Sequence, residues 1–154
     1  MPAMNAKTPL SEFLPYQLSI TSNAVSGRIA LEYRQRFGLS VPEWRVMAVL
    51  GDAGPLTQRD LTRLTLMDKV AVNRACKVLE ERGLVSRSPN ARDGRSHHLE
   101  LTAQGRAMFD EIMPLALDME KRLFACLSRG ETEALKASLG KLLGRAGEML
   151  DKRT

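Results

Sequence analysis

Four polar side chains recur on one side of the segment from residue 69 to residue 82, and each has a well-known way of contacting nucleic acid. They are Lys69, Asn73, Arg74 and Lys77. Val72, Cys76 and Leu79 follow one another at four- and three-residue steps, so a helix here would bury them and leave the polar set outside. Asparagine can bond an adenine edge in two places, arginine a guanine edge and lysine a phosphate, while an exposed Val70 can touch a thymine methyl group. The segment therefore predicts a helix that reads DNA.

Positive charge is concentrated around this segment. The chain has 154 residues, a formal net charge of +5 and a pI of about 9.6. Between residues 58 and 95 there are nine Lys or Arg against five Asp or Glu, a net of +4, so most of the excess charge lies in this part of the chain. A basic face of this kind attracts phosphate. A solvated charged surface is the alternative explanation of the charge alone.

A second set of charged residues occupies the stretch RSPNARDGRSHHLELT, which begins at Arg87. Arg92 and Arg95 flank an aspartate and a glycine at its centre, and an arginine at a hairpin tip can enter a narrow minor groove. Arg87 stands at the base of the stretch, where it can reach the phosphate backbone. Phosphate would repel Asp93, so we expect this carboxylate to orient an arginine. A flexible charged turn is the alternative for this stretch taken alone.

Two short helices must position the first set. Thr57 and Asp60 have the spacing of a capping box, which starts one helix near residue 58. Asp68 suits the N-cap of the next helix, over residues 69–82, and Gly83 suits its end. Only the tripeptide TLM separates the two helices, which is long enough for a tight turn and nothing more. The sequence therefore predicts a helix-turn-helix.

A hairpin and longer helices complete the expected fold. Apolar and polar residues alternate in the second of two short strand candidates, residues 84–88 and 97–101, and turn residues separate the two. A hairpin directly after a helix-turn-helix is a wing. Apolar residues at three- or four-residue steps predict further helices over about residues 12–37, 42–51 and 103–127, and a last one to about residue 150. The fold class is therefore mainly α with a small β-hairpin wing.

Other classes of function have little support in the sequence. No apolar run approaches the ~18 residues of a membrane span, and the N-terminus has no secretory signal. With only Cys76 and Cys126, a disulfide framework is excluded and the cytoplasm is the expected location. His97 and His98 are neighbours on a strand and point to opposite faces, so they cannot chelate one metal ion together. Because no phosphate-binding glycine loop, dinucleotide fingerprint or nucleophile motif occurs, we expect neither an enzyme nor a cofactor.

The stretch from Leu56 to Gly105 resembles the winged helix-turn-helix of the MarR family of bacterial transcription regulators. The matching pieces are RA-KVLEERGLV, the Asp-x-Arg of the wing and LELTAQG, and PEWRVMAVL upstream resembles the second helix of the family. By this resemblance Asn73, Arg74 and Lys77 match the reading helix and Arg95 the wing arginine. The chain start has no periodic pattern, so residues 1–10 are expected to form a disordered tail. The resemblance implies a single domain at residues 11–154, with a winged helix-turn-helix lobe at about 42–102. Helices at about 12–37 and 103–150 would interleave in a homodimer.

The resemblance also implies what the protein does. A two-fold dimer would place two recognition helices about one DNA turn apart, ~34 Å, and so bind a palindromic operator as a sequence-specific repressor. Release by a small molecule, such as an aromatic or phenolic acid, is typical of the family, and Phe13, Tyr16 and Trp44 are the candidate pocket, with core packing as the alternative. The alternative functions are an architectural DNA binder that senses nothing and a winged-helix module for protein interaction.

Overall fold

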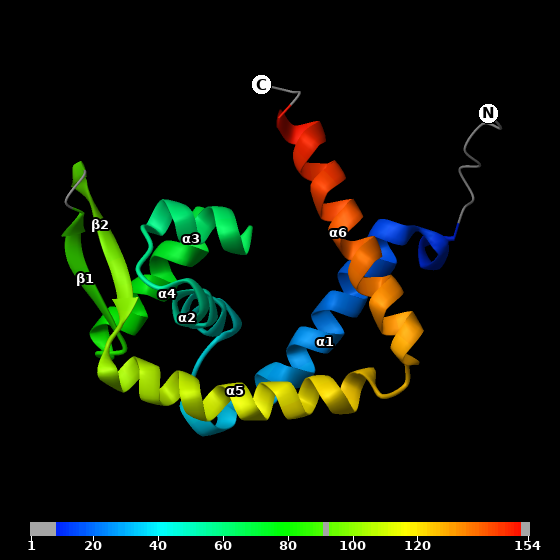
Figure 1. The fold of residues 1–154 in the computed structure, drawn as a ribbon, viewed down its shortest axis with the longest axis horizontal. Coiled ribbons are helices and arrows are strands. Elements are labelled where there is room, and N and C mark those ends of the chain that lie inside the picture. The colour runs from blue at the N-terminus through cyan, green and yellow to red at the C-terminus, as the bar shows by residue number, and fades with distance from the viewer. Residues whose placement is uncertain (1–8, 91–92, 152–154) are drawn as a thin grey trace. The chain divides into compact units, whose positions relative to one another are not determined.

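The computed structural model describes residues 9–90 and 93–151. In chain order the elements are a short 3₁₀ helix η1 (Leu10–Glu12), α1 (Leu14–Phe37), α2 (Val41–Ala53), α3 (Gln58–Thr65), α4 (Lys69–Glu81), β1 (Val85–Asn90), β2 (Asp93–Leu101), α5 (Ala103–Phe124) and α6 (Arg129–Asp151) (Figure 1). The chain divides into two compact units, one up to Leu117 and one from Asp118 onward. The mainly helical fold with a two-stranded wing agrees with the prediction.

The predicted capping residues begin the helices of the helix-turn-helix. The Thr57 hydroxyl accepts a hydrogen bond from the backbone N–H of Asp60 at 3.1 Å, and the Asp60 carboxylate accepts one from the N–H of Thr57 at 3.2 Å. The Asp68 carboxylate accepts a hydrogen bond from the N–H of Val70 at 2.7 Å and so caps α4. Leu66, with φ of 54°, is the C-cap of α3, at the start of the turn between the two helices. The left-handed conformation is unusual for a residue other than glycine, and here it makes the turn tight.

The wing is longer than predicted. β1 and β2 pair antiparallel from Val85 opposite Leu101 to Asn90 opposite Asp93, so most of the stretch expected to be a loop belongs to strands. Pairing extends this far because β1 is an edge strand, where the missing N–H of Pro89 costs little. Leu56 also bridges to Leu99 through two backbone hydrogen bonds of 3.0 and 2.7 Å. The segment before α3 thus fixes the wing to the helix-turn-helix.

One hydrophobic core joins α1, α2, α3, α4, the wing and the first part of α5. It contains, among others, Tyr33, Met47, Leu50, Leu61, Leu79, Leu84, Leu99 and Ile112. Trp44 packs between Tyr33 and Phe109, with ring centroids 5.7 and 6.0 Å apart. This core holds the helix-turn-helix and the wing in fixed relation to each other, because well-packed side chains leave little room for rearrangement.

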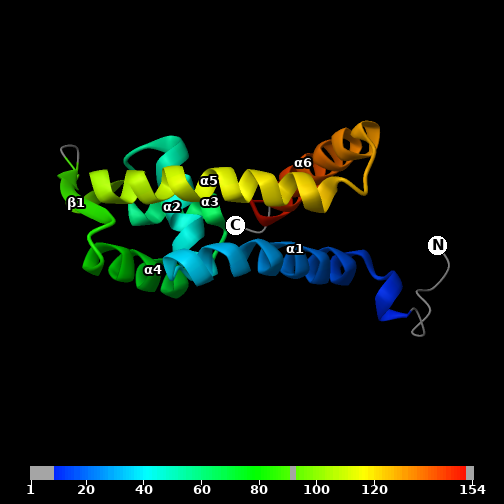
Figure 2. The same cartoon turned by 90° about the horizontal axis from the view of Figure 1, so that it is seen from below.

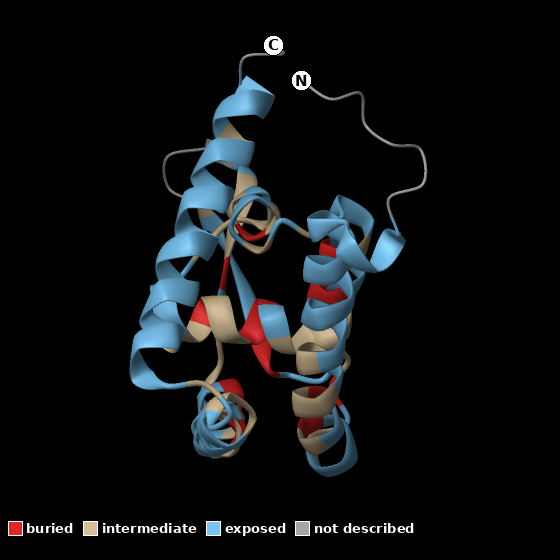
Figure 3. Ribbon diagram, turned by 90° about the vertical axis from the view of Figure 1, so that its right-hand side faces the viewer, coloured by how far each residue is buried: buried red, intermediate tan, exposed pale blue. Residues whose placement is uncertain are grey.

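The long helices differ in how much they bury. α5 continues through Pro114 as one helix (Figure 2) and ends at Phe124, before the predicted end at residue 127. α6 contains no buried residue among those described, and in Figure 3 the helix leading to the C-terminus is almost wholly in the colour of exposed residues. Of the predicted tail at 1–10, residues 1–8 lie outside the described residues and Leu10 begins η1. None of the described helices is long and apolar enough to cross a membrane.

Candidate nucleic-acid interface

Helix α4 separates its side chains into a buried and an exposed set, as predicted. Val72, Ala75, Cys76 and Leu79 are buried in the core. The predicted DNA-reading residues Lys69, Asn73, Arg74 and Lys77 are all exposed, together with Val70, whose side chain is 60% exposed. Because the buried set holds the helix, the exposed set has a fixed direction. The structure thus brings all five predicted residues of α4 to one accessible face.

Arg87 on β1 is engaged in an ion pair within the protein. Its guanidinium donates two hydrogen bonds of 2.9 Å to the two carboxylate oxygens of Glu80 on α4. This bidentate contact lowers the pKa of Glu80 and raises that of Arg87. A third N–H of Arg87 points at the Gln58 side-chain oxygen, at 3.4 Å. The predicted reach of Arg87 to the DNA backbone therefore competes with a contact that ties the wing to α4.

The wing presents Arg95 as an exposed side chain on β2. Next to it, the Asn90 amide donates a hydrogen bond of 3.0 Å to the Ser96 hydroxyl, which links the two strands where their register shifts. Arg92 and the side chain of Asp93 lie outside the described part of the structure. Their predicted contacts, like that of Arg95 with a minor groove, stay predictions.

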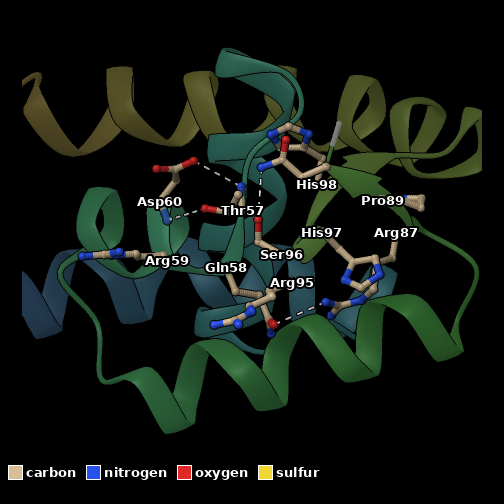
Figure 4. A pocket seen from close by; sticks show the side chains of 11 residues that line it. Thr57, Gln58, Arg59, Asp60, Arg87, Pro89, Arg95, Ser96, His97 and His98 are labelled. Carbon is tan, nitrogen blue, oxygen red and sulfur yellow. Dashed lines mark hydrogen bonds between the residues drawn. The ribbon is translucent and has the colours of Figure 1, made fainter. Parts of the chain in front are cut away.

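A cleft of about 840 Å³ separates the first turn of α3 from the wing (Figure 4). Its charged or titratable lining residues are Arg59, Asp60, Arg87, Arg95, His97 and His98. The Asp60 carboxylate is occupied by its capping role, and the hydrogen bond from the Thr57 backbone, with smaller contributions from the Thr57 hydroxyl and Arg63, lowers its pKa. Among the described residues that line the cleft, Arg59, Arg87 and Arg95 carry guanidinium groups and Asp60 alone carries a carboxylate, so the charge of this lining favours anions.

A second, smaller cleft runs between α3 and α4. Gln58, Arg59, Thr62, Arg63, Lys69 and Asn73 line it. Gln58, Arg59 and Arg63 were not among the residues predicted to contact DNA. Helical periodicity could have predicted them, because they lie on the outward side of α3, whose one buried residue is Leu61. The basic face therefore extends from α4 across α3 to the wing.

The candidate ligand-pocket aromatics are not brought together in the chain. Trp44 contributes to the core beside Tyr33, which was the alternative for it. Phe13 and Tyr16 are 48% and 38% exposed, at the other end of α1. At 1.5 Å per residue, Tyr16 lies roughly 25 Å along the helix from Tyr33. The chain by itself therefore does not form one pocket lined by Phe13, Tyr16 and Trp44.

The two cysteines differ in their burial. Burial raises the pKa of Cys76, and a hydrogen bond from Gln58 opposes this only in part. Cys126 is exposed, and its thiol lies 3.4 Å from the carbonyl oxygen of Leu123. Among the residues that the structure describes, no three His, Cys, Asp or Glu side chains gather in a way that would hold a metal ion.

Comparison with known proteins identifies the family. Residues 37–96 match the model of the MarR family. The MarR family transcriptional regulator SPO1453 from Silicibacter pomeroyi is 32% identical, and the alignment covers 91% of this chain and 99% of that one with a TM-score of 0.78. The chain belongs to the MarR family. It is thus a DNA-binding transcriptional regulator, as the resemblance of its wing and reading helix implied.

Two further similar proteins bear on function. The transcriptional repressor NicR of Pseudomonas putida is 31% identical over 97 residues, which are 63% of this chain and 61% of NicR. A point mutant of MarR from E. coli, solved in complex with operator DNA, is 25% identical, with a TM-score of 0.77 and coverage of 89% of this chain and 99% of that one. The chain thus shares its fold with a regulator seen on its operator.

Proposed function

We propose that this MarR-family chain is a homodimeric, sequence-specific repressor that acts in the cytoplasm on a palindromic operator. The observation that carries the proposal is the division of α4, where four core residues fix the helix and Lys69, Asn73, Arg74 and Lys77 are exposed on its other side. A helix held in this way can enter a major groove with its polar side chains toward base edges and phosphates. Repression, rather than activation, is proposed by analogy with the repressor NicR.

The rest of the basic face has separate roles in this proposal. Arg59 and Arg63 on α3 contact the phosphate backbone beside the groove that α4 enters, as the first helix of a helix-turn-helix does. Arg95 on the wing extends toward the neighbouring minor groove, where the negative potential is strongest over narrow A·T stretches. Arg87 positions the wing through Glu80, and Arg92 and Asp93 keep their predicted roles at the tip.

Dimerisation is proposed from apolar side chains that each long helix leaves exposed. On α6 these include Leu135, Leu139, Leu142 and Met149, which follow one stripe, and on α1 they include Leu14 and Leu18. Exposed apolar stripes of this length are typical of an interface with another chain. A second copy of the same chain gives a two-fold axis, which matches a palindromic operator with half-sites ~34 Å apart.

A small-molecule effector completes the proposal. We take its class, an aromatic or phenolic acid, from the family and not from a cavity of the chain. Because Phe13 and Tyr16 are exposed at the start of α1, a pocket that includes them would be completed by the partner subunit. The test is release of a bound operator by a panel of aromatic carboxylic acids.

Selection from a random DNA library tests the central part of the proposal. The bound fraction is sequenced at two salt concentrations. A palindromic consensus with half-sites about one helical turn apart is the expected result. Binding without a consensus, together with a steep loss of affinity in salt, would leave only phosphate attraction and would contradict a sequence-specific regulator. An architectural DNA binder would then be the better account, and absence of binding would favour the protein-interaction module.

A further inference from the structure

Four side chains form a continuous chain of hydrogen bonds from the base of the wing to the DNA-reading face. Glu80 accepts two hydrogen bonds from Arg87, and Arg87 donates a third to the side-chain oxygen of Gln58 at 3.4 Å. The Gln58 side-chain nitrogen donates in turn to the side-chain oxygen of Asn73 at 3.2 Å. The four side chains thus connect α4, β1 and α3, and the last of them, Asn73, is exposed on the face of α4 that we propose reads DNA.

Glu80 and Arg87 set the direction of every bond in this series of hydrogen bonds. A guanidinium has only donors and a carboxylate only acceptors, so the contact between Arg87 and Gln58 requires the amide oxygen of Gln58. The amide nitrogen of Gln58 must then face α4. Gln58 therefore cannot turn over without losing the bond from Arg87.

Asn73 inherits a fixed orientation from Gln58. Its side-chain oxygen accepts the bond from Gln58, and none of the described residues accepts a bond from its side-chain nitrogen. An asparagine that uses both atoms can bond an adenine edge in two places, which needs one donor and one acceptor. The bond from Gln58 turns the oxygen of Asn73 toward α3, although one of its two lone pairs stays available, and the side-chain nitrogen is thereby directed away from α3. Its donors match the O6 and N7 acceptors of guanine and the O4 acceptor of thymine, whereas adenine offers only N7, next to a donor amino group.

We propose that Gln58 is a positioning residue that makes Asn73 a hydrogen-bond donor toward DNA, so that Asn73 selects guanine or thymine over adenine or cytosine. The inference rests on the proposed function, since it assumes that α4 reads base edges. It adds a residue of α3 to the determinants of specificity. Gln58 acts through Asn73 and need not contact a base.

Library selection with three variants tests this inference. Asn73→Ala identifies the operator position that Asn73 reads, as the position in each half-site whose preference is lost. Gln58→Glu replaces the donor to Asn73 by an acceptor while keeping a partner for Arg87, so Asn73 turns over and presents its oxygen. We expect the ratio of guanine and thymine to adenine and cytosine at that position to fall on the order of fivefold or more. Gln58→Ala removes the constraint and should leave a weaker preference, with adenine gained.

The readout separates positioning from a general loss of binding. A carboxylate at position 58 repels phosphate at every site equally, so the base ratio within one library is unaffected by that repulsion. Thermal unfolding controls the fold, and a negative charge in the first turn of α3 is favourable there. Gln35→Glu, on an exposed part of α1, is the matched control and should keep the wild-type preference.

The outcomes distinguish this inference from the proposed function. A wild-type consensus together with an unchanged base ratio in Gln58→Glu and Gln58→Ala would overturn the inference and leave the proposed function standing. A wild-type library without any consensus would overturn both. A preference lost in Asn73→Ala and reversed in Gln58→Glu is the supporting result.

Discussion

Arg87 of β1 donates two hydrogen bonds of 2.9 Å to Glu80 of α4. Nε of the guanidinium bonds Oε1 of the carboxylate, and Nη2 bonds Oε2. Both side chains are about 30% exposed, so the pair is partly shielded from water. The contact joins the wing to the recognition helix directly, in addition to their shared core. The two elements that we expect on DNA are thereby positioned relative to each other before DNA is bound.

The Glu80–Arg87 pair gives the stability of the protein a pH dependence. The bond from Arg87 lowers the pKa of Glu80 in the folded chain below the ordinary value, ~4.3 for the unfolded chain. The pair therefore makes its full contribution to stability at pH values above this ordinary pKa. The contribution is lost as the pH falls below that value and through the lower pKa that Glu80 has in the folded chain. Glu80→Gln should destabilise the protein by about 1 kcal/mol at pH 7 and by clearly less at pH 3.

Urea unfolding at the two pH values measures this difference. Glu120→Gln, at an exposed position of α5, is the matched control and should change the free energy of unfolding by less than ~0.5 kcal/mol at pH 7. An equal loss in Glu80→Gln at pH 7 and pH 3 would show that the Arg87 contact does not stabilise the charged carboxylate.

Alanine variants of Lys77 and Arg74 distinguish a phosphate contact from a base contact. Lys77→Ala should weaken binding to operator and to random DNA by similar factors and reduce the slope of log affinity against log salt by about 0.9. Arg74→Ala and Arg95→Ala should weaken operator binding strongly while the dimer stays folded. Fluorescence anisotropy with labelled duplexes measures both effects. Lys136→Ala, on α6, serves as the control, and wild-type affinity in the Arg74 and Arg95 variants would refute the orientation proposed on DNA.

Gly105 of α5 lies close against the backbone of Leu84, the residue before β1. A Cβ atom at this position would lie 2.0 Å from the carbonyl oxygen of Leu84, and backbone cannot move aside cheaply. Gly105→Ala should therefore destabilise the protein by more than about 2 kcal/mol. Gly140→Ala is the matched control, because no atom lies within 4 Å of its Cβ and alanine favours a helix interior by up to ~1 kcal/mol. Chemical unfolding of both variants should give opposite signs, and equal signs would contradict the packing described here.

The apolar stripe of α6 should decide the oligomeric state. Leu139→Glu places a charge in the stripe and should convert the proposed dimer to a monomer at micromolar concentration. Ala137→Glu, on the opposite side of the same helix, should leave the dimer intact. Sedimentation equilibrium measures both. A monomeric wild type, or a dimer unaffected by Leu139→Glu, would mean that α6 does not form the interface.

Much of the fold followed from local patterns in the sequence. Thr57, Asp60 and Asp68 predicted where α3 and α4 begin because capping depends on neighbours a few residues apart. The spacing of Val72, Cys76 and Leu79 predicted which side of α4 is buried for the same reason. The length of the wing was underestimated, since strand pairing and the bridge from Leu56 depend on residues far apart in the chain.

The candidate site was predicted only in part. The outward residues of α4 could be read from helical periodicity. The engagement of Arg87 by Glu80 could not, because the two residues meet only once β1 packs beside α4. For the same reason the role of Gln58 between Arg87 and Asn73 depends on three elements and has no signature within any of them.

The ratio of affinities for a consensus operator and a scrambled duplex of equal length tests the central claim most directly. At physiological salt, a sequence-specific regulator that reads DNA with α4 should show a ratio on the order of a thousand or more. Asn73→Ala should reduce that ratio while its affinity for the scrambled duplex stays near the wild-type value. A wild-type ratio close to one, or a ratio that Asn73→Ala leaves unchanged, would contradict the claim that α4 reads the operator.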